Sequence, residues 1–174
     1  MLTQEENMFM ARVGPGTPMG DLMRRFWHPV LLSEELPAPD CPPKRTRILG
    51  EDLIAFRDTN GDVGLVDNYC PHRRASLFFG RNEECGLRCV YHGWKFDING
   101  DCIDMPSEPA ESNFKEKVKL TAYPTNEGAG MVWAYMGPSE LKPEMPQLEY
   151  LEVPDDQFVS TKVTYEPNFV QVIE

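Results

Sequence analysis

The chain has 174 residues, of which 41% are hydrophobic, and this suits one packed domain or one domain with pieces of another. Its 17 lysines and arginines stand against 28 aspartates and glutamates, a formal net charge of −11, which argues against a nucleic-acid partner and against binding to an anionic membrane. No stretch approaches the roughly 20 apolar residues of a membrane-spanning helix, and the first residues do not resemble a signal peptide, so we expect a cytoplasmic protein.

The N-terminal part predicts a short helix, an extended segment and a linker. Residues 18–32 read PMGDLMRRFWHPVLL, which is compatible with a helix that runs into an extended segment. Residues 36–44 read LPAPDCPPK, and neither a helix nor an inner strand tolerates so many prolines. We therefore assign residues 1–41 to an N-terminal helix and linker.

The middle of the chain predicts an antiparallel β domain over residues 42–137. Short apolar runs alternate there with turn residues, and an Asn-Gly pair at positions 99 and 100 is typical of a hairpin. Residues 138–174 begin with a second proline-rich stretch, followed by a strand candidate over residues 157–167 and a helix-compatible end over residues 168–174. We interpret residues 138–174 as a linker and the start of a further domain.

Two short motifs carry most of the candidate chemistry. The first motif is Cys70-x-His72, which directly follows an expected strand, and the second motif is Cys89-x-x-His92, between two further strand candidates. In a reducing compartment the five cysteines of the chain are expected to be metal ligands or core residues rather than disulfides. Two loops that each supply one thiolate and one imidazole predict a metal site with these four ligands.

Two kinds of metal site compete for this ligand set. Tetrahedral zinc accepts two cysteines and two histidines, but its paired ligands usually have two to four residues between them, so that a Cys-x-His pair is atypical. The interpretation that we favour is a [2Fe-2S] cluster with two cysteines on one iron and two histidines on the other. Neutral imidazoles in place of two thiolates raise the reduction potential of such a cluster.

Three segments support this interpretation: residues 70–81 (CPHRRASLFFGR), residues 89–109 (CVYHGWKFDINGDCIDMPSEP) and residues 117–138 (KVKLTAYPTNEGAGMVWAYMGP). Together they resemble the Rieske domain of aromatic-ring-hydroxylating oxygenases, most closely the phthalate dioxygenase type. The resemblance implies a mainly β fold, with a Rieske-type antiparallel β-sandwich domain and a small cluster-binding subdomain, flanked by short helical or extended strips of an incomplete catalytic domain. It also implies that Cys70 and Cys89 ligate the buried iron, whereas His72 and His92 ligate an outer iron near the surface.

The resemblance further implies which residues surround the cluster, namely Arg73, Tyr91, Gly93 and Trp94, and that residues 105–109 cover its other side. Several Rieske proteins carry a serine after the His-Gly of the second motif, and its hydroxyl raises the potential. Trp94 stands at that place, so we expect a potential at the low end of the Rieske range, about −150 mV. We also expect Trp94 to shield the cluster from water.

Basic residues gather around the two motifs of this otherwise acidic chain. The five basic side chains between residues 70 and 95, which we call the basic island, are Arg73, Arg74, Arg81, Arg88 and Lys95. Only two acidic side chains, at positions 83 and 84, lie among them. We expect the basic island to raise the potential slightly, and we hypothesise that it receives an acidic electron donor.

By this resemblance the chain is the electron-transfer portion of a ring-hydroxylating dioxygenase of aromatic hydrocarbon catabolism. A flavin or iron-sulfur reductase, or a ferredoxin, would deliver electrons that come ultimately from NAD(P)H. A mononuclear Fe(II) would then use them with O₂ to hydroxylate an aromatic substrate, and the full-length protein is expected to be a homo-oligomer, a trimer. Two alternatives stay open, a free-standing Rieske ferredoxin-type electron carrier and a zinc-stabilised binding module.

The histidine count bears on the second iron. The mononuclear iron of these oxygenases is held by two histidines and a carboxylate. The chain has three histidines, and with His72 and His92 on the cluster only His28 remains. We therefore expect no catalytic residue in this chain, a mononuclear iron site beyond Glu174, and a chain that by itself transfers electrons without hydroxylating a substrate.

The remaining candidate residues have structural interpretations. We expect His28 to lie under the first helix, Cys85 to be a spare loop thiol, Cys102 to be a core residue and Cys41 to belong to the linker. Residues 77–79 are expected to pack beneath the first motif.

Overall fold

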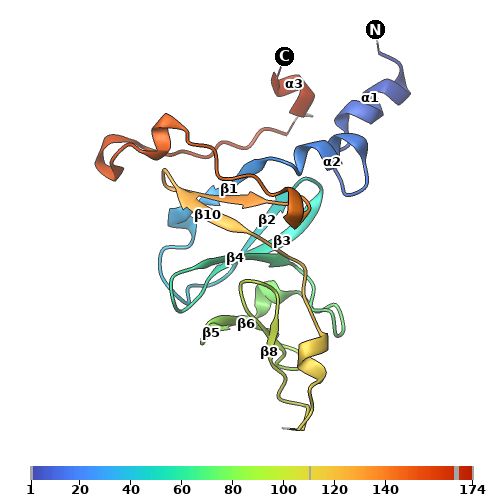
Figure 1. Ribbon diagram of the computed structural model, residues 1–174, viewed down its shortest axis with the longest axis vertical. Coiled ribbons are helices and arrows are strands. Elements are labelled where there is room, and N and C mark those ends of the chain that lie inside the picture. Colours follow the sequence, from blue (N-terminus) through green and yellow to red (C-terminus); the bar gives the residue numbers. More distant parts are fainter. Residues whose placement is uncertain (1, 110, 167–168, 174) are drawn as a thin grey trace.

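The computed structural model describes residues 2–109, 111–166 and 169–173, and within them the protein is mainly β, as predicted. Three antiparallel sheets follow one another along the long axis of the molecule, and the α-helices lie at one end (Figure 1). The α-helices are α1 (Gln4–Ala11), α2 (Pro18–Met23) and α3 (Phe169–Ile173). Short 3-10 helices span Ser33–Glu35, Leu77–Phe79, Phe114–Lys117, Ser139–Leu141, Glu149–Leu151 and Asp155–Gln157.

The three sheets differ in the length of their strands. The first sheet has the order β1-β11-β10 and consists of β1 (Trp27–Leu32), β11 (Met131–Tyr135) and β10 (Thr125–Gly128). The second has the order β2-β3-β4-β9 and consists of β2 (Lys44–Ile48), β3 (Glu51–Arg57), β4 (Val63–Asp67) and β9 (Ala122–Tyr123). The third has the order β5-β6-β7-β8 and consists of β5 (Arg81–Glu83), β6 (Gly86–Arg88), β7 (Lys95–Phe96) and β8 (Cys102–Asp104).

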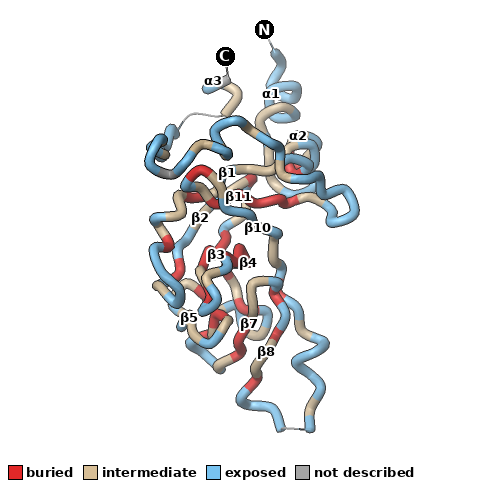
Figure 2. Tube along the Cα trace, turned by 60° about the vertical axis from the view of Figure 1, so that its left-hand side comes forward, coloured by how far each residue is buried: buried red, intermediate tan, exposed pale blue. Residues whose placement is uncertain are grey.

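Strand β3 separates two hydrophobic cores. Because successive side chains of a strand point to opposite faces, Leu53 and Ala55 pack into a core shared with the first sheet, whereas Ile54 and Phe56 pack into a core shared with the third sheet. All four side chains are buried, and Figure 2 shows the buried positions running through the strands. The two motif cysteines, Cys70 and Cys89, belong to the second of these cores.

Both ends of the described chain lie at the end of the molecule opposite to β5–β8, as Figures 1 and 2 both show. Helix α1, which the sequence analysis did not predict, begins with a capping box between Thr3 and Glu6. The buried Arg24 ties the end of α2 to the β2–β3 turn, because its guanidinium donates to the Leu49 carbonyl at 2.9 Å and to the Glu51 carboxylate at 2.6 Å. In the described residues, no helix is both long and apolar enough to cross a membrane.

Strand β1 comes from the part of the chain that was assigned to an N-terminal helix and linker. The helix and the extended segment predicted over residues 18–32 are confirmed as α2 and β1. The sequence did not indicate that β1 pairs with β11, more than 90 residues away, with Trp27 opposite Tyr135 and Leu32 opposite Met131. The register shifts between Pro29 and Leu31, next to the proline that has no N–H to donate.

The strand predicted over residues 157–167 is wrong for the part that the structure describes, residues 157–166. This segment forms no strand there, and Val159, Val163 and Tyr165 are exposed. A run of β-branched residues becomes a strand only beside a partner, and here side chains make the contacts: Ser160 donates to the Ala129 carbonyl, and Lys162 pairs with Glu35. Residue 167 lies outside the described residues. Helix α3 confirms the helix-compatible end for residues 169–173, and residues 168 and 174 lie outside the described residues.

Candidate metal centre

The first motif lies in the loop over residues 68–76, which follows β4 as predicted. Backbone hydrogen bonds close the loop on itself: the Cys70 N–H donates to the Ala75 carbonyl and the Arg74 N–H donates to the Cys70 carbonyl, each at 2.9 Å. At its base the buried Asn68 accepts a hydrogen bond from the Ser76 hydroxyl at 2.6 Å. One charged side chain also takes part, because the Asp67 carboxylate accepts a hydrogen bond from the Tyr69 N–H at 3.0 Å and pairs with Arg74 at 3.5 Å. Backbone and neutral side-chain hydrogen bonds make up the other contacts that fix the shape of the loop.

The second motif lies in the loop over residues 89–94, between β6 and β7. The Cys89 N–H donates to the Trp94 carbonyl at 2.8 Å, and the Gly93 N–H donates to the Cys89 carbonyl at 3.1 Å. Gly93 has a φ of +76°, and a Cβ atom there would lie 3.1 Å from Cγ of Pro106. Glycine is thus required both by the backbone conformation and by the close neighbour.

The two loops bring the four predicted ligands together as two pairs. Cys70 and Cys89 are 2% and 3% exposed, and their thiols are neighbours in the interior. The rings of His72 and His92 lie outside them with centroids 4.4 Å apart, His72 partly exposed and His92 exposed. The structure thus places two sulfur donors inside and two nitrogen donors toward the surface.

Aromatic rings enclose the histidine pair. The buried Trp94 stacks on His72 with ring centroids 4.5 Å apart and an interplanar angle of 7°. The ring of the exposed Tyr91 lies against His92 with centroids 3.9 Å apart, and Phe114 contacts Trp94 edge-on with centroids 6.2 Å apart. Nδ1 of His72 and Nε1 of Trp94 are both buried without a hydrogen-bond partner in the described residues. A buried nitrogen without a partner is costly unless it binds something, and for His72 a metal would satisfy it.

The protonation of the ligand set also fits a metal. Burial raises the pKa of the Cys70 thiol to about 11, and the adjacent Cys89 thiol adds to the rise while the backbone N–H groups of His72 and Arg73 oppose it. A thiol with such a pKa becomes a thiolate only beside a compensating positive charge, as in a metal site. Desolvation, followed by the positive charges of His92 and Arg73, lowers the pKa of His72, which favours the neutral imidazole that binds metals.

The grouping in pairs bears on the choice between zinc and a cluster. A structural zinc needs its four ligands around one point. A [2Fe-2S] cluster needs only two protein ligands at each iron, and an inner pair of thiols with an outer pair of imidazoles fits that requirement.

Most members of the basic island form ion pairs within the protein, which the sequence did not indicate. Four of its five members are ion-paired: Arg74 with Asp67, Arg81 with Glu83, Arg88 with Glu83 and Asp104, and Lys95 with Glu84. Arg73 alone among them has no carboxylate partner in the described part of the chain, and it is exposed beside the first motif. A count of charges between residues 70 and 95 includes Glu83 and Glu84 but not Asp67 and Asp104, and it does not show which charges form pairs.

The region around the motifs confirms some expectations and corrects one. Leu77 is fully buried beneath the first motif, but Phe79 is 66% exposed, and the Arg45 guanidinium lies over its ring at 5.2 Å. Within residues 105–109, Met105 is buried and Pro106 lies against Gly93. That part of the chain therefore does pack beside the second motif.

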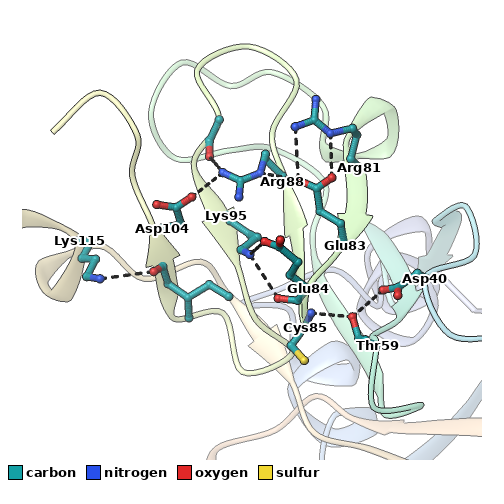
Figure 3. Close-up of polar contacts among 12 residues, drawn as sticks. Asp40, Thr59, Arg81, Glu83, Glu84, Cys85, Arg88, Lys95, Asp104 and Lys115 are labelled. Carbon is teal, nitrogen blue, oxygen red and sulfur yellow. Dashed lines mark hydrogen bonds and ion pairs between the residues drawn. The ribbon is translucent and has the colours of Figure 1, made fainter. Parts of the chain in front are cut away.

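The other cysteines and His28 have structural positions. Nε2 of His28 lies 2.7 Å from the Met23 carbonyl, Cys102 is buried in the core, and Cys41 is half-buried with its carbonyl accepting from Asn82. Cys85 is the second residue of the β5–β6 turn and has a φ of +58°, a conformation in which glycine is favoured. Its N–H donates to the Thr59 hydroxyl, which in turn donates to Asp40 (Figure 3).

One residue near the centre was missed as a functional residue. Arg88 was counted only as part of the basic island, but its guanidinium joins the second motif loop to two carboxylates, and Figure 3 shows it between Glu83 and Asp104. A basic residue directly before a ligand cysteine was the available signal. The distant partner at position 104 could not be read from the sequence.

Residues 26–124 match the family described as the Rieske [2Fe-2S] domain. The phthalate 4,5-dioxygenase oxygenase subunit of Pseudomonas putida is 59% identical over 144 residues, which cover 83% of this chain and 33% of that protein. The 3-chlorobenzoate-3,4-dioxygenase oxygenase subunit of Comamonas testosteroni is 49% identical over 174 residues, which cover 100% of this chain and 40% of that protein.

Two solved structures are similar as well. A dicamba monooxygenase bound to dicamba has a TM-score of 0.62 and 29% identity, covering 70% of this chain and 35% of that one. The oxygenase in an oxygenase–ferredoxin complex of carbazole 1,9a-dioxygenase has a TM-score of 0.62 and 26% identity, covering 83% of this chain and 34% of that one. The chain thus spans 33% and 40% of the length of the two relatives named above.

Proposed function

This chain belongs to the Rieske [2Fe-2S] domain family, and from this premise we propose that it is the electron-transfer part of a ring-hydroxylating oxygenase. The observation that carries the proposal is the separation of the ligands, with two buried thiols behind two imidazoles that reach the surface. Such an arrangement suits a centre that exchanges electrons with a partner while its inner half stays dry.

We propose that Cys70 and Cys89 hold the inner iron of the cluster and that His72 and His92 hold the outer one. When bound, a cluster of this type takes up and releases one electron, at a potential that its histidine ligands raise. The neighbouring residues would have separate tasks. Trp94 excludes water from the inner side of His72, Gly93 lets the second loop pass close to Pro106, and Arg73 and Tyr91 border the exposed edge of the histidine pair.

The electron donor and the acceptor would both lie outside this chain. We propose a flavin or iron-sulfur reductase or a ferredoxin as the donor, supported by the carbazole 1,9a-dioxygenase structure, in which an oxygenase is in complex with a ferredoxin. The acceptor would be a mononuclear iron in a catalytic region that the relatives contain beyond the length shared with this chain. An aromatic substrate, a trimeric oligomer and a cytoplasmic location belong to the same proposal.

His28 is not available as a ligand of a mononuclear iron. Its ring nitrogen Nε2 is engaged with the Met23 carbonyl, and the chain has three histidines in all. We therefore propose that residues 1–174 contain no catalytic residue for hydroxylation.

The division of the chain also stays a proposal. The sequence places the N-terminal helix and linker at residues 1–41, the Rieske domain at 42–137 and the linker to a catalytic region at 138–174. The pairing of β1 with β11, and a family match that begins at residue 26, support moving the first boundary to about residue 26.

The free-standing electron carrier is the weaker alternative. The alignment with the 3-chlorobenzoate-3,4-dioxygenase oxygenase subunit extends over 174 residues, so it includes the segments on both sides of the Rieske domain. A carrier would have no need of these segments, whereas an oxygenase would pack them on its catalytic region.

Metal analysis of the purified protein tests the proposal. We expect about two irons and two sulfides per chain and an EPR signal after reduction with dithionite. Cys89→Ala and His92→Ala should each lose the signal and most of the iron, while Cys102→Ala should keep both, because Cys102 is a core residue. Stoichiometric zinc without sulfide would overturn the proposal.

A further inference from the structure

The side chain of Arg88 makes three hydrogen bonds directly beside the second motif. Its Nε donates to Oε1 of Glu83 at 2.7 Å, and its Nη1 donates both to the Gly93 carbonyl at 2.8 Å and to Oδ2 of Asp104 at 2.7 Å (Figure 3). The residue lies at the end of β6, next to Cys89, and its side chain is only 13% exposed. One guanidinium therefore joins β5, the motif loop and the end of β8.

This arrangement fixes the part of the loop that carries His92. Gly93 directly follows His92, and its carbonyl has Arg88 as its one side-chain donor among the described residues. Gly93 has a left-handed φ, and few other contacts hold the loop in the conformation that this φ creates. The adjacent residues 90–92 are exposed or make ring contacts only. The planar fork of arginine can hold the carbonyl and two carboxylates at once, whereas a lysine ammonium is a single point.

The arrangement also places one positive and two negative charges near the proposed cluster ligands. Arg88 is a mostly buried cation, and Glu83 and Asp104 are 34% and 44% exposed. A positive charge stabilises the state with the added electron, and a negative charge destabilises it. The two carboxylates hold Arg88 in place, and their negative charges partly offset its effect on the potential.

We propose that Arg88 is a positioning residue of the second motif, which holds the His92 loop through the Gly93 carbonyl and sets the electron affinity of the centre together with Glu83 and Asp104. The proposal rests on the proposed function, because it assigns a role toward the cluster. It differs from the earlier idea of a docking patch, since the charge of Arg88 is used inside the protein.

Three substitutions separate the two parts of this role. Arg88→Gln removes the charge and the fork, and should lower the reduced-to-oxidised ratio at a fixed ambient potential roughly fivefold. Asp104→Asn removes a negative charge and should raise that ratio by a similar factor. Arg88→Lys keeps the charge and loses the fork, so it should stay near the wild-type ratio but change the EPR line shape, which reports the geometry at the histidine-ligated iron.

Arg81→Gln is the matched control. Arg81 also pairs with Glu83, at 3.0 Å, but its side chain is 69% exposed and makes no hydrogen bond to the motif loop. We expect a change of less than about twofold in the same ratio, because solvent screens the charge. Redox titration and EPR of the iron-loaded protein measure all four variants.

The outcomes decide the proposal. Opposite shifts for Arg88→Gln and Asp104→Asn, with a small shift for Arg81→Gln, support it. Shifts of the same sign, or a wild-type EPR line shape in Arg88→Lys, overturn it. If Arg88→Gln does not fold, the Arg88→Lys and Asp104→Asn variants still decide. A wild-type protein without iron and sulfide would instead refute the proposed function, so the two failures are distinguishable.

Discussion

The loops over residues 68–76 and 89–94 each present one cysteine and one histidine to the same centre, but different forces hold them. The first loop is held mainly by backbone hydrogen bonds and by the neutral pair of Asn68 and Ser76, and Asp67 is its one charged partner in the described residues. The second has fewer backbone contacts and depends on a left-handed glycine and on the ion pairs of Arg88. Two similar motifs can therefore respond differently to substitution, acid and salt.

The largest expected effect concerns the glycine of the second loop. Gly93→Ala should destabilise the protein by about 3 kcal/mol, because a left-handed φ strains an alanine and the new Cβ would lie 3.1 Å from Pro106. Gly61→Ala is the control, since Gly61 has a φ of +93° with open space around it, and should cost about 1 kcal/mol. Chemical unfolding and iron content measure both variants, and equal losses would refute the role of the contact.

A smaller effect is expected in the first loop. Asn68→Ala removes the acceptor of the Ser76 hydroxyl at a buried site and should cost about 2 kcal/mol. The loss should be independent of salt concentration, because no charge is involved. Ser112→Ala, which removes two exposed hydrogen bonds, one to Glu108 and one from the Phe114 N–H, should cost less than about 1 kcal/mol. A salt-dependent loss in Asn68→Ala would contradict the comparison of the two loops.

The smallest effect is expected from acid. Hydrogen bonds from Arg81 and then Arg88 lower the pKa of Glu83 to about 2 from an ordinary value of 4.5, and Arg88 also lowers the pKa of Asp104. A carboxylate with a depressed pKa stabilises the fold above its unfolded pKa, and the contribution fades as the pH falls from about 4.5 to about 2. The second loop should therefore loosen in this range before the first.

Hydrogen exchange of single amides tests this order. Protection of the Gly93 amide, corrected for the intrinsic exchange rate, should fall below about pH 4.5, while that of the Cys70 amide persists. In Glu83→Gln the protection of Gly93 should depend less on pH in this range, because only Asp104 of the two carboxylates still titrates. Simultaneous loss at both amides would mean that the loops open together.

The sequence predicted the features of this site that depend on residues close together in the chain, and it did not predict those that depend on distant residues. Cys70, His72, Cys89 and His92 are close neighbours within each motif, so their spacing predicted two ligand loops, which the structure brings together. Two partners of the basic island, Asp67 and Asp104, lie outside the stretch between residues 70 and 95, so the charges within that stretch did not indicate how far the island is neutralised.

The fold shows the same limit. Turn residues predicted the short strands of residues 42–137, and these exist. The pairing of β1 with β11 depends on residues far apart in the sequence. Residues 157–166 have the composition of a strand but form none, because no neighbouring strand pairs with them. The left-handed conformation of Cys85 was not indicated by the sequence either, because that conformation favours glycine and position 85 is a cysteine.

The central claim is that these two loops hold a mixed-ligand iron-sulfur centre for electron transfer. A redox titration followed by EPR, with iron, sulfide and zinc measured on the same sample, tests it most directly. We expect about two irons and two sulfides per chain and a midpoint potential near the low end of the Rieske range, about −150 mV. A midpoint near −400 mV, as in plant-type ferredoxins with four cysteine ligands, or zinc in place of iron, would contradict it.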